Sequence, residues 1–194
     1  MRSEIDLTDD EATALSLLQR IQPATAYQIG KIYAASPVSN YGTSKGKIYP
    51  LIRRLKERGL LQSQPVAGDA RGAEWLTCTA KGRQALRQWI KSIRPTHTLL
   101  EDPLRTMLQS IDLLRPSEKM KWVEAAQAAL SAKLGELEAY RETVFVPYKD
   151  LLHDNAAQSL RVRIDWLKRV RQALIEDERP AASRQPGARA KGKS

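Results

Sequence analysis

Apolar residues recur every three or four positions along three stretches of the first half of the chain, a spacing typical of amphipathic helices. Each stretch follows a residue type that commonly caps a helix N-terminus, namely Thr8, Thr25 and Ser44. The first two stretches end just before a proline, and the third ends at about residue 58, before Gly59. We therefore expect three consecutive helices.

A hairpin and a fourth helix are predicted next. Residues 60–64 and 74–78 favour strands, and turn-forming glycines lie between them. Thr79 then precedes a helix that runs to about residue 93. Its core-facing residues are predicted to be Leu86, Trp89, Ile90 and Ile93. This order of elements is that of a winged helix-turn-helix, in which the third helix enters the major groove of DNA and the hairpin touches the flanking backbone.

The second half of the chain predicts helices alone, so the fold class is mainly α. A short helix begins at Asp102-Pro103 and ends at about residue 114, a longer one spans about 116–144, and a last one spans about 156–175. Apolar residues recur every seven positions in the longer helix and line one stripe of the last, as in helices that pack against partners. The residues that we predict to mediate dimerisation are Val123, Leu130, Leu137, Val144, Leu160, Ile164 and Leu167.

The composition is that of an ordinary globular protein of 194 residues, 42% of them hydrophobic. No apolar stretch approaches the roughly 20 residues needed to cross a bilayer, and the acidic N-terminus does not resemble a signal peptide, so we expect a cytoplasmic protein. One Cys cannot form an internal disulfide, and two His with one Cys cannot form an all-His/Cys zinc site. No cofactor or metal is predicted.

The net charge of +10 is unevenly distributed along the chain. Residues 24–95 carry 13 Lys and Arg against 3 Asp and Glu, residues 101–178 carry 12 against 14, and residues 179–194 carry 5 basic residues and no acidic one. We predict a winged-helix DNA-binding domain over residues 1–95, a helical dimerisation or effector domain over 96–178 and a basic disordered tail over 179–194. The basic excess of the first domain indicates a polyanionic partner.

The run SKGKIYPLIRRLKERGLL, residues 44–61, resembles the third helix of PadR-type transcriptional regulators, which carry a Gly-Thr-Leu-Tyr-Pro-Leu-Leu-Arg-Arg-Leu-Glu-x-x-Gly-Leu pattern. The matching residues are Gly46, Tyr49, Pro50, Leu51, Arg53, Arg54, Leu55 and Gly59. Residues 26–29 resemble the family's Gly-Tyr-Glu-Ile segment, and residues 79–83 its Thr-Glu-x-Gly-Arg helix start. The sequence departs from the family pattern at Ala26, Gln28, Lys47 and Cys78.

The resemblance extends to the second half of the chain. Asp-Pro-Leu-Arg from residue 102 and Asp165-Trp166-Leu167 are similar to the C-terminal helical domain of the virulence-activator branch of these regulators. The resemblance implies a homodimer that binds double-stranded DNA at a palindromic operator. Because PadR-type members are mostly repressors we expect repression, although the virulence-activator branch includes activators.

The third helix supplies most of the predicted DNA contacts, from its first turn to its paired arginines, with further contacts from the second helix and the wing. These residues are Tyr27, Gln28, Ser44, Lys45, Lys47, Tyr49, Arg53, Arg54 and Arg71. A second group of aromatic residues is a candidate lining for a small aromatic effector, as in some PadR-type relatives, but aromatic residues at helical spacing more often belong to a dimer core. This group comprises Trp122, Tyr140, Phe145, Tyr148 and Trp166.

Other motifs favour structural roles. Residues 42–46 form a G-x-S-x-G string and residues 187–194 a phosphate-loop string, but neither has the flanking strand and helix that the chemistry requires. His97 and His153 are expected on the surface, and Cys78 in the core of a strand. Two alternatives to a DNA-binding regulator stay open: a winged-helix module that binds a protein, and an enzyme of unrecognised type, although no acid–base constellation is present in the sequence.

Overall fold

The computed structural model describes residues 6–38, 45–70, 72–144 and 146–178, and the side chain of Lys45 is not described. Ser44, Arg71 and Phe145, three of the predicted site residues, lie outside the described residues. The chain divides into two compact units, Met1–Leu100 (unit 1) and Glu101–Ser194 (unit 2). Both are described below as separate bodies.

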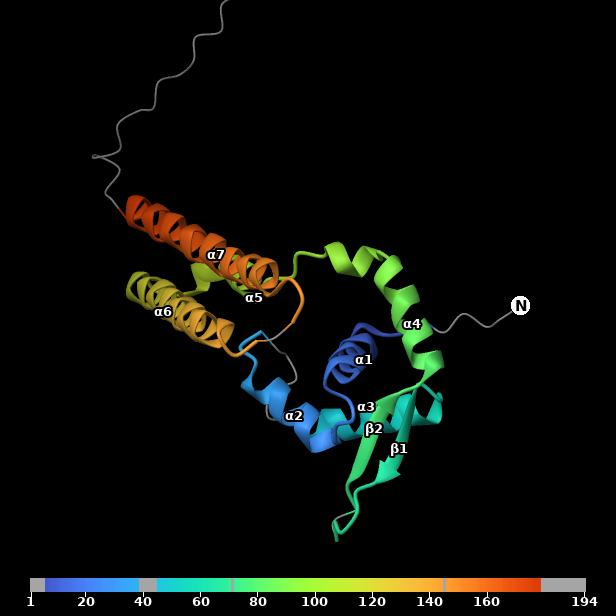
Figure 1. The fold of residues 1–194 in the computed structure, drawn as a ribbon. Helices are drawn as coiled ribbons and strands as arrows, with labels where there is room; N and C mark the ends of the chain where they lie inside the picture. Colours follow the sequence, from blue (N-terminus) through green and yellow to red (C-terminus); the bar gives the residue numbers. More distant parts are fainter. Residues whose placement is uncertain (1–5, 39–44, 71, 145, 179–194) are drawn as a thin grey trace, which may run out of the picture. The chain divides into compact units, whose positions relative to one another are not determined.

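Unit 1 has the winged-helix order that the sequence predicts (Figure 1). Its elements are α1 (Asp9–Ile21), α2 (Ala26–Ala35), α3 (Lys45–Glu57), β1 (Leu61–Pro65), β2 (Glu74–Cys78), α4 (Ala80–Lys91) and a 3-10 turn, η1 (Pro95–Thr98). The two strands form an antiparallel hairpin in which Leu61 pairs with Cys78 and Pro65 with Glu74. Ala24, in the α1–α2 connection, adds an isolated bridge to Leu76 that ties the wing to the first two helices.

Three predicted helix caps are confirmed. The side chain of Thr8 accepts a hydrogen bond from the backbone N–H of Glu11, that of Thr25 from Gln28, and that of Thr79 from Gly82. In α1 and α2 the side chain of the third helical residue accepts a hydrogen bond from the backbone N–H of the cap residue, which completes a capping box. Local sequence therefore fixes where these helices begin.

The core of unit 1 is built around α1, which lies against α2, α3, α4 and β2 (Figure 1). Leu15, Ile29, Leu55 and Leu76 are among its fully buried side chains. Gly82 lets α4 approach the hairpin closely, because a Cβ there would collide with the backbone oxygen of Leu60 and lie 2.9 Å from Cys78 Sγ.

The inward orientation predicted for Ile90 and Ile93 is wrong, since they are 63% and 78% exposed. The buried positions of α4 centre on Ala85 and Leu86, with Trp89 partly buried against the core. Ile90 lies roughly a quarter turn from that line, and Ile93 follows the end of the helix at Lys91.

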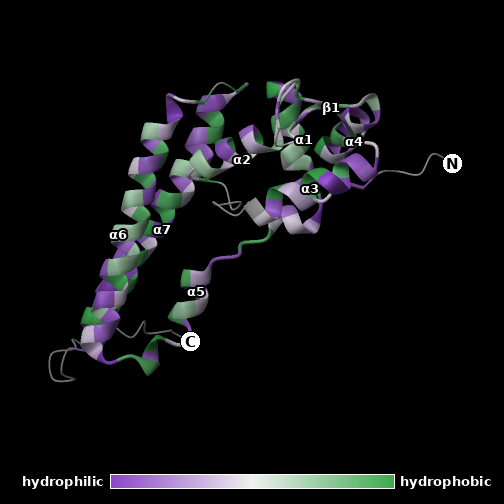
Figure 2. Cartoon of the chain, turned by 90° about the horizontal axis from the view of Figure 1, so that it is seen from below, coloured by the Kyte–Doolittle hydropathy of each residue, from purple (hydrophilic) through white to green (hydrophobic). Residues whose placement is uncertain are grey.

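Unit 2 is a hairpin of two long helices preceded by a short helix and a 3-10 turn. Its elements are α5 (Pro103–Leu108), a 3-10 turn, η2 (Ile111–Leu113), α6 (Pro116–Arg141) and α7 (Lys149–Asp177). Helices α6 and α7 lie side by side and run in opposite directions (Figure 1). Figure 2 shows hydrophobic and hydrophilic residues alternating along both helices, and their buried residues, Val123, Leu130, Leu167 and Val170 among them, form one core.

The turn between α6 and α7 differs from the prediction. Helix α6 ends at Arg141 instead of residue 144, and α7 begins at Lys149 instead of residue 156. Tyr148 precedes α7 in a left-handed conformation (φ 59°), so the chain reverses within a few residues. The apolar residues Leu151 and Leu152 in the first turn of α7 are exposed, so they do not follow the periodicity of core residues from which the start of this helix was predicted.

Within the described part of the chain, no helix combines the length and apolar character needed to cross a membrane.

Candidate nucleic-acid interface

Helix α3 presents a basic and aromatic surface to solvent on the side away from its core residues. Ile48, Leu51 and Leu55 are buried, whereas Lys47 is exposed and Tyr49 is 53% exposed. The side chain of Arg53 is 74% exposed and makes a surface ion pair with Glu57, 3.7 Å away in the next turn. Such an exposed pair leaves a guanidinium available to another anion.

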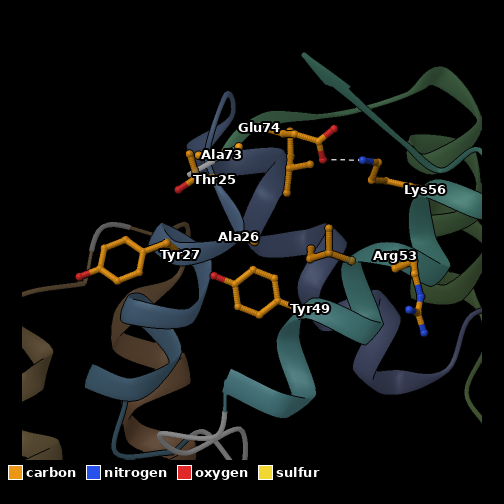
Figure 3. A pocket seen from close by; sticks show the side chains of 11 residues that line it. Thr25, Ala26, Tyr27, Tyr49, Arg53, Lys56, Ala73 and Glu74 are labelled. Carbon is orange, nitrogen blue, oxygen red and sulfur yellow. Dashed lines mark hydrogen bonds and ion pairs between the residues drawn. The ribbon is translucent and has the colours of Figure 1, made fainter. Parts of the chain in front are cut away.

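Tyr27 extends this surface from the start of α2. A cleft of about 300 Å³ lies between α2, α3 and the base of the wing, and its lining includes Tyr27, Tyr49 and Arg53 (Figure 3). Tyr27 is 64% exposed, so both tyrosine rings reach solvent at this cleft. We call this surface the α3 face, and it consists of the exposed residues Lys47, Tyr49 and Arg53 of α3 together with Tyr27 of α2.

Lys56 differs from the residues of the α3 face because its charge is paired with a carboxylate of the fold. Its ammonium group pairs with the carboxylate of Glu74 in β2 (Figure 3). Ser63 Oγ in β1 donates to the other oxygen of Glu74 at 2.9 Å. The hydrogen bonds from Lys56 and Ser63 lower the pKa of Glu74. Lys56 therefore links α3 to the wing.

Arg58 and Arg54 turn towards a buried carboxylate in α1. Arg58 Nη1 donates to Glu11 Oε2 at 2.6 Å, and Arg54 Nε lies 4.0 Å from Glu11 Oε1. The side chain of Glu11 is only 4% exposed. Burial acts to raise the pKa of Glu11, but the hydrogen bonds from Arg58 and from the Thr8 N–H, with the charges of both arginines, lower it overall.

The cations in and just after α3 therefore do not form one uniform solvent-exposed surface. Lys47 and Arg53 face solvent, whereas Lys56 and Arg58 are held by acidic residues of β2 and α1, and Arg54 lies between these extremes. Gln28, another predicted contact, is exposed but its side-chain oxygen accepts the backbone N–H of Thr25 at 2.8 Å. Its first role is to cap α2.

Sequence reasoning missed a cluster around Asp9, at the start of α1. Asp9 Oδ1 accepts hydrogen bonds from Trp89 Nε1 at 2.9 Å and Arg94 Nη2 at 2.8 Å, and His97 Nε2 lies 3.1 Å away. The hydrogen bond from Trp89 is the largest influence that lowers the pKa of Asp9, with smaller ones from His97 and Arg94. His97 is exposed, as the sequence predicted, and it also takes part in this polar network.

His153, in contrast, departs from its predicted surface position, because its side chain is 6% exposed in α7. Its Nε2 lies 3.0 Å from Glu138 Oε2 in α6, and Glu138 Oε1 accepts from Arg161 at 2.9 Å. This contact joins the two long helices at the end near their connection. Cys78 is buried, as predicted, and burial raises the pKa of its thiol, which does not favour a reactive thiolate.

The residues predicted for dimerisation all belong to unit 2, and most of them lie in its interior. Val123, Leu130 and Leu167 are buried in the α6–α7 core, Leu160 and Ile164 pack against it, Leu137 is buried in α6, and Val144 is half-buried. Among the predicted effector residues, Trp122 and Trp166 pack against the same core. Tyr140 is half-buried and Tyr148 is 79% exposed. The structure thus brings the two tryptophans to one core and leaves Tyr148 outside it.

The chain combines a winged-helix unit with a helical hairpin unit, and the third helix of the first unit is basic, aromatic and exposed. This combination is typical of DNA-binding proteins. The model of the Transcriptional regulator PadR-like family matches residues 14–88. A comparison with curated proteins finds no match. The N-terminal segment of the chain is therefore similar to the PadR-like family of transcriptional regulators.

Solved structures share the fold over both units. PadR of Bacillus subtilis in complex with operator DNA is 18% identical, with a TM-score of 0.70, and the match covers 86% of this chain and 99% of that chain. The same protein in complex with p-coumaric acid gives a TM-score of 0.66, and the match covers 86% of this chain and 96% of that chain. The PadR-like regulator BC1756 from Bacillus cereus is 17% identical (TM-score 0.69; 89% and 99%). The Vibrio cholerae virulence activator AphA is 20% identical (0.59; 86% and 96%). These matches establish the fold.

Proposed function

We propose that this protein is a sequence-specific DNA-binding regulator that acts in the cytoplasm as a homodimer on a palindromic operator. The observation that carries the proposal is the α3 face, where Lys47, Tyr49 and Arg53 are exposed together while neighbouring cations are held by carboxylates. Cations without a strong internal partner can exchange counterions for DNA phosphates, which supplies most of the non-specific affinity.

Each residue of the interface has a proposed role. Lys47 and Tyr49, near the start of α3, contact base edges and nearby phosphates together with Ser44 and Lys45. Arg53 and Arg54 contact the DNA backbone or lie at its margin, and Arg71 in the wing reaches phosphate or the minor groove. Tyr27 and Gln28 help to anchor α2. The operator complex of the similar Bacillus subtilis PadR supports this assignment at the level of the fold.

We place the dimer contacts in unit 2. The seven-residue pattern of α6 is largely buried inside the chain, but Tyr148, just before α7, and three apolar residues of α7 stay exposed in one copy: Tyr148 79%, Leu151 67%, Leu152 57% and Val162 64%. Exposed apolar groups of this size are candidates for burial by a second copy, together with the predicted seam residues. A two-fold dimer would read two half-sites about 34–36 Å apart.

We further propose that the regulator represses transcription and responds to a small aromatic molecule. Repression follows from the resemblance to PadR-type regulators, which are mostly repressors. The complex of Bacillus subtilis PadR with p-coumaric acid supports an aromatic effector at the level of the fold. In this chain the candidate contacts are Trp122, Tyr140, Phe145, Tyr148 and Trp166.

A gel shift of the purified protein on DNA from upstream of its own gene, at two salt concentrations, tests the function. The proposal predicts a discrete shift at dimer stoichiometry that resists competitor DNA and weakens steeply with salt. A protein-interaction module would show no half-site symmetry and salt-insensitive binding to its partner. If the only signal is a smear that competitor abolishes, with and without aromatic acids, the regulator proposal fails.

A further inference from the structure

We propose that residues 6–11 couple the segment that follows α4 to helix α3, so that a change in that segment alters the DNA-binding helix. The consequence for DNA affinity rests on the function proposed above. The contacts themselves lie within unit 1, and their coupling can be tested without DNA.

One side of residues 6–11 holds the segment that leaves α4. Arg94 donates to the carboxylates of Asp6 (3.3 Å) and Asp9 (2.8 Å) and to the carbonyl oxygen of Leu7 (3.0 Å). The backbone N–H of Arg94 donates to His97 Nδ1 at 3.2 Å. The neutral His97 ring therefore carries its hydrogen on Nε2 and donates it to Asp9, 3.1 Å away.

The other side of the same segment holds the end of α3. Arg58 donates to the carboxylate of Glu11 and to the carbonyl oxygen of Asp6, each at 2.6 Å. The backbone N–H groups of Arg58, Gly59 and Leu60 close the C-terminus of α3 through hydrogen bonds to Arg54, Lys56 and Leu55. Arg58 thus connects the last turn of the helix directly to residues 6–11.

Asp6 takes part in both sets of contacts, since its carboxylate accepts from Arg94 and its carbonyl oxygen from Arg58. Between them, Leu7 is 1% exposed, and the capping box between Thr8 and Glu11 fixes the first turn of α1. The segment is therefore held at a buried leucine and at a closed turn. A shift on the Arg94 side must be absorbed by the groups that hold Arg58, because the intervening residues have little freedom to move independently.

Groups that share one hydrogen-bonded network respond non-additively to substitution. We therefore expect the effect to be reciprocal: loosening Arg94 loosens the end of α3, and loosening Arg58 loosens residues 94–97. Residues 94–97 lie just before unit 2, which makes this network a physical route by which events beyond residue 100 could reach α3.

Amide hydrogen exchange on the full chain without DNA tests the coupling. In Arg94→Gln, the amides of Arg58, Gly59 and Leu60 should exchange about tenfold faster, and in Arg58→Gln those of Arg94 and His97 should do the same. The Val66 amide, bonded to Ala73 in the wing, reports general loss of stability. The matched control is Arg20→Gln, which removes a cation from the last turn of α1 and should change neither set.

Acceleration confined to the distant end of the network, in both variants, supports the coupling. Equal acceleration at Val66, or none at the distant end, overturns it. Operator binding is then measured on the same variants: the coupling predicts that Arg94→Gln weakens binding severalfold more than Arg20→Gln. If none of the proteins binds the operator, the proposed function fails, while the exchange result still decides the coupling.

Discussion

The cations in and just after α3 carry the same charge but fall into two groups, one exposed to solvent and one paired with carboxylates of the fold. We call the first group the available half and the second the held half. Lys47 and Arg53 project into solvent, whereas Lys56 and Arg58, close by in the chain, are held by Glu74 and Glu11. The first pair can exchange its counterions for another polyanion, and the second already has its anions within the fold. The number of cations on a helix therefore overstates the surface that is available to DNA, and the partners of each cation decide its role.

The largest loss of stability is expected when the ion pairs that hold Arg58 and Arg54 are removed. Glu11→Gln removes a carboxylate that is 4% exposed and leaves Arg58 and Arg54 without their partner. Because Arg58 is 34% exposed and water can partly replace the lost carboxylate, the expected loss is that of a charge-assisted hydrogen bond, about 2 kcal/mol in the free energy of unfolding. Urea denaturation measures it, and a loss below about 1 kcal/mol would show that Glu11 does not hold α3.

The pH dependence of stability sharpens the same point. The lowered pKa of Glu11 means that its contribution is fully present above its usual value of 4.5 and is lost as the pH falls through its folded-state pKa. Glu74, whose pKa is lowered by Lys56 and Ser63, acts in the same direction. We expect the free energy of unfolding to fall between about pH 5 and pH 3, and to fall less in Glu11→Gln. An identical pH profile for both proteins would contradict the assignment.

On the available half of α3, Tyr49→Ala should separate binding from folding. Tyr49 is 53% exposed, so the substitution should change the free energy of unfolding by less than about 1 kcal/mol. Loss of its contacts with DNA should weaken operator binding about tenfold, as measured by titration with labelled operator. Tyr49→Phe, which keeps the ring, is the control for the hydroxyl group. A loss of stability that matches the loss of binding would place Tyr49 in the core instead.

The smallest effect is expected for the surface pair between Arg53 and Glu57. Both side chains are mostly exposed, at 74% and 65%. Glu57→Gln should therefore change the free energy of unfolding by less than about 0.5 kcal/mol, in contrast to Glu11→Gln. It should also strengthen DNA binding slightly, because Arg53 loses a competing anion. Destabilisation comparable to that of Glu11→Gln would remove the distinction between the two halves.

Local features of the fold were predictable from the sequence, because the residues that determine them are neighbours in the chain. The caps at Thr8, Thr25 and Thr79 and the hairpin order are confirmed. The start of α7 was predicted too late, since exposed apolar residues in its first turn interrupt the periodicity.

The candidate site was only partly predictable. Solvent exposure of Lys47, Tyr49 and Arg53 agrees with their predicted role, but the ion pairs that engage the other cations join residues far apart in sequence. Arg58 meets Glu11 across 47 positions, and His97 meets Asp9 across 88. Periodicity and charge counts carry no information on such pairs, which form only when the helices pack.

The salt dependence of operator binding in two matched variants tests the central claim most directly. Lys47→Gln and Lys56→Gln each remove one lysine charge from α3, the first from the α3 face and the second from the pair with Glu74. We predict that Lys47→Gln reduces the slope of log K against log salt by about one unit, and that Lys56→Gln leaves it nearly unchanged. Equal reductions in both variants, or a reduction only in Lys56→Gln, would contradict the division of α3 into an available and a held half.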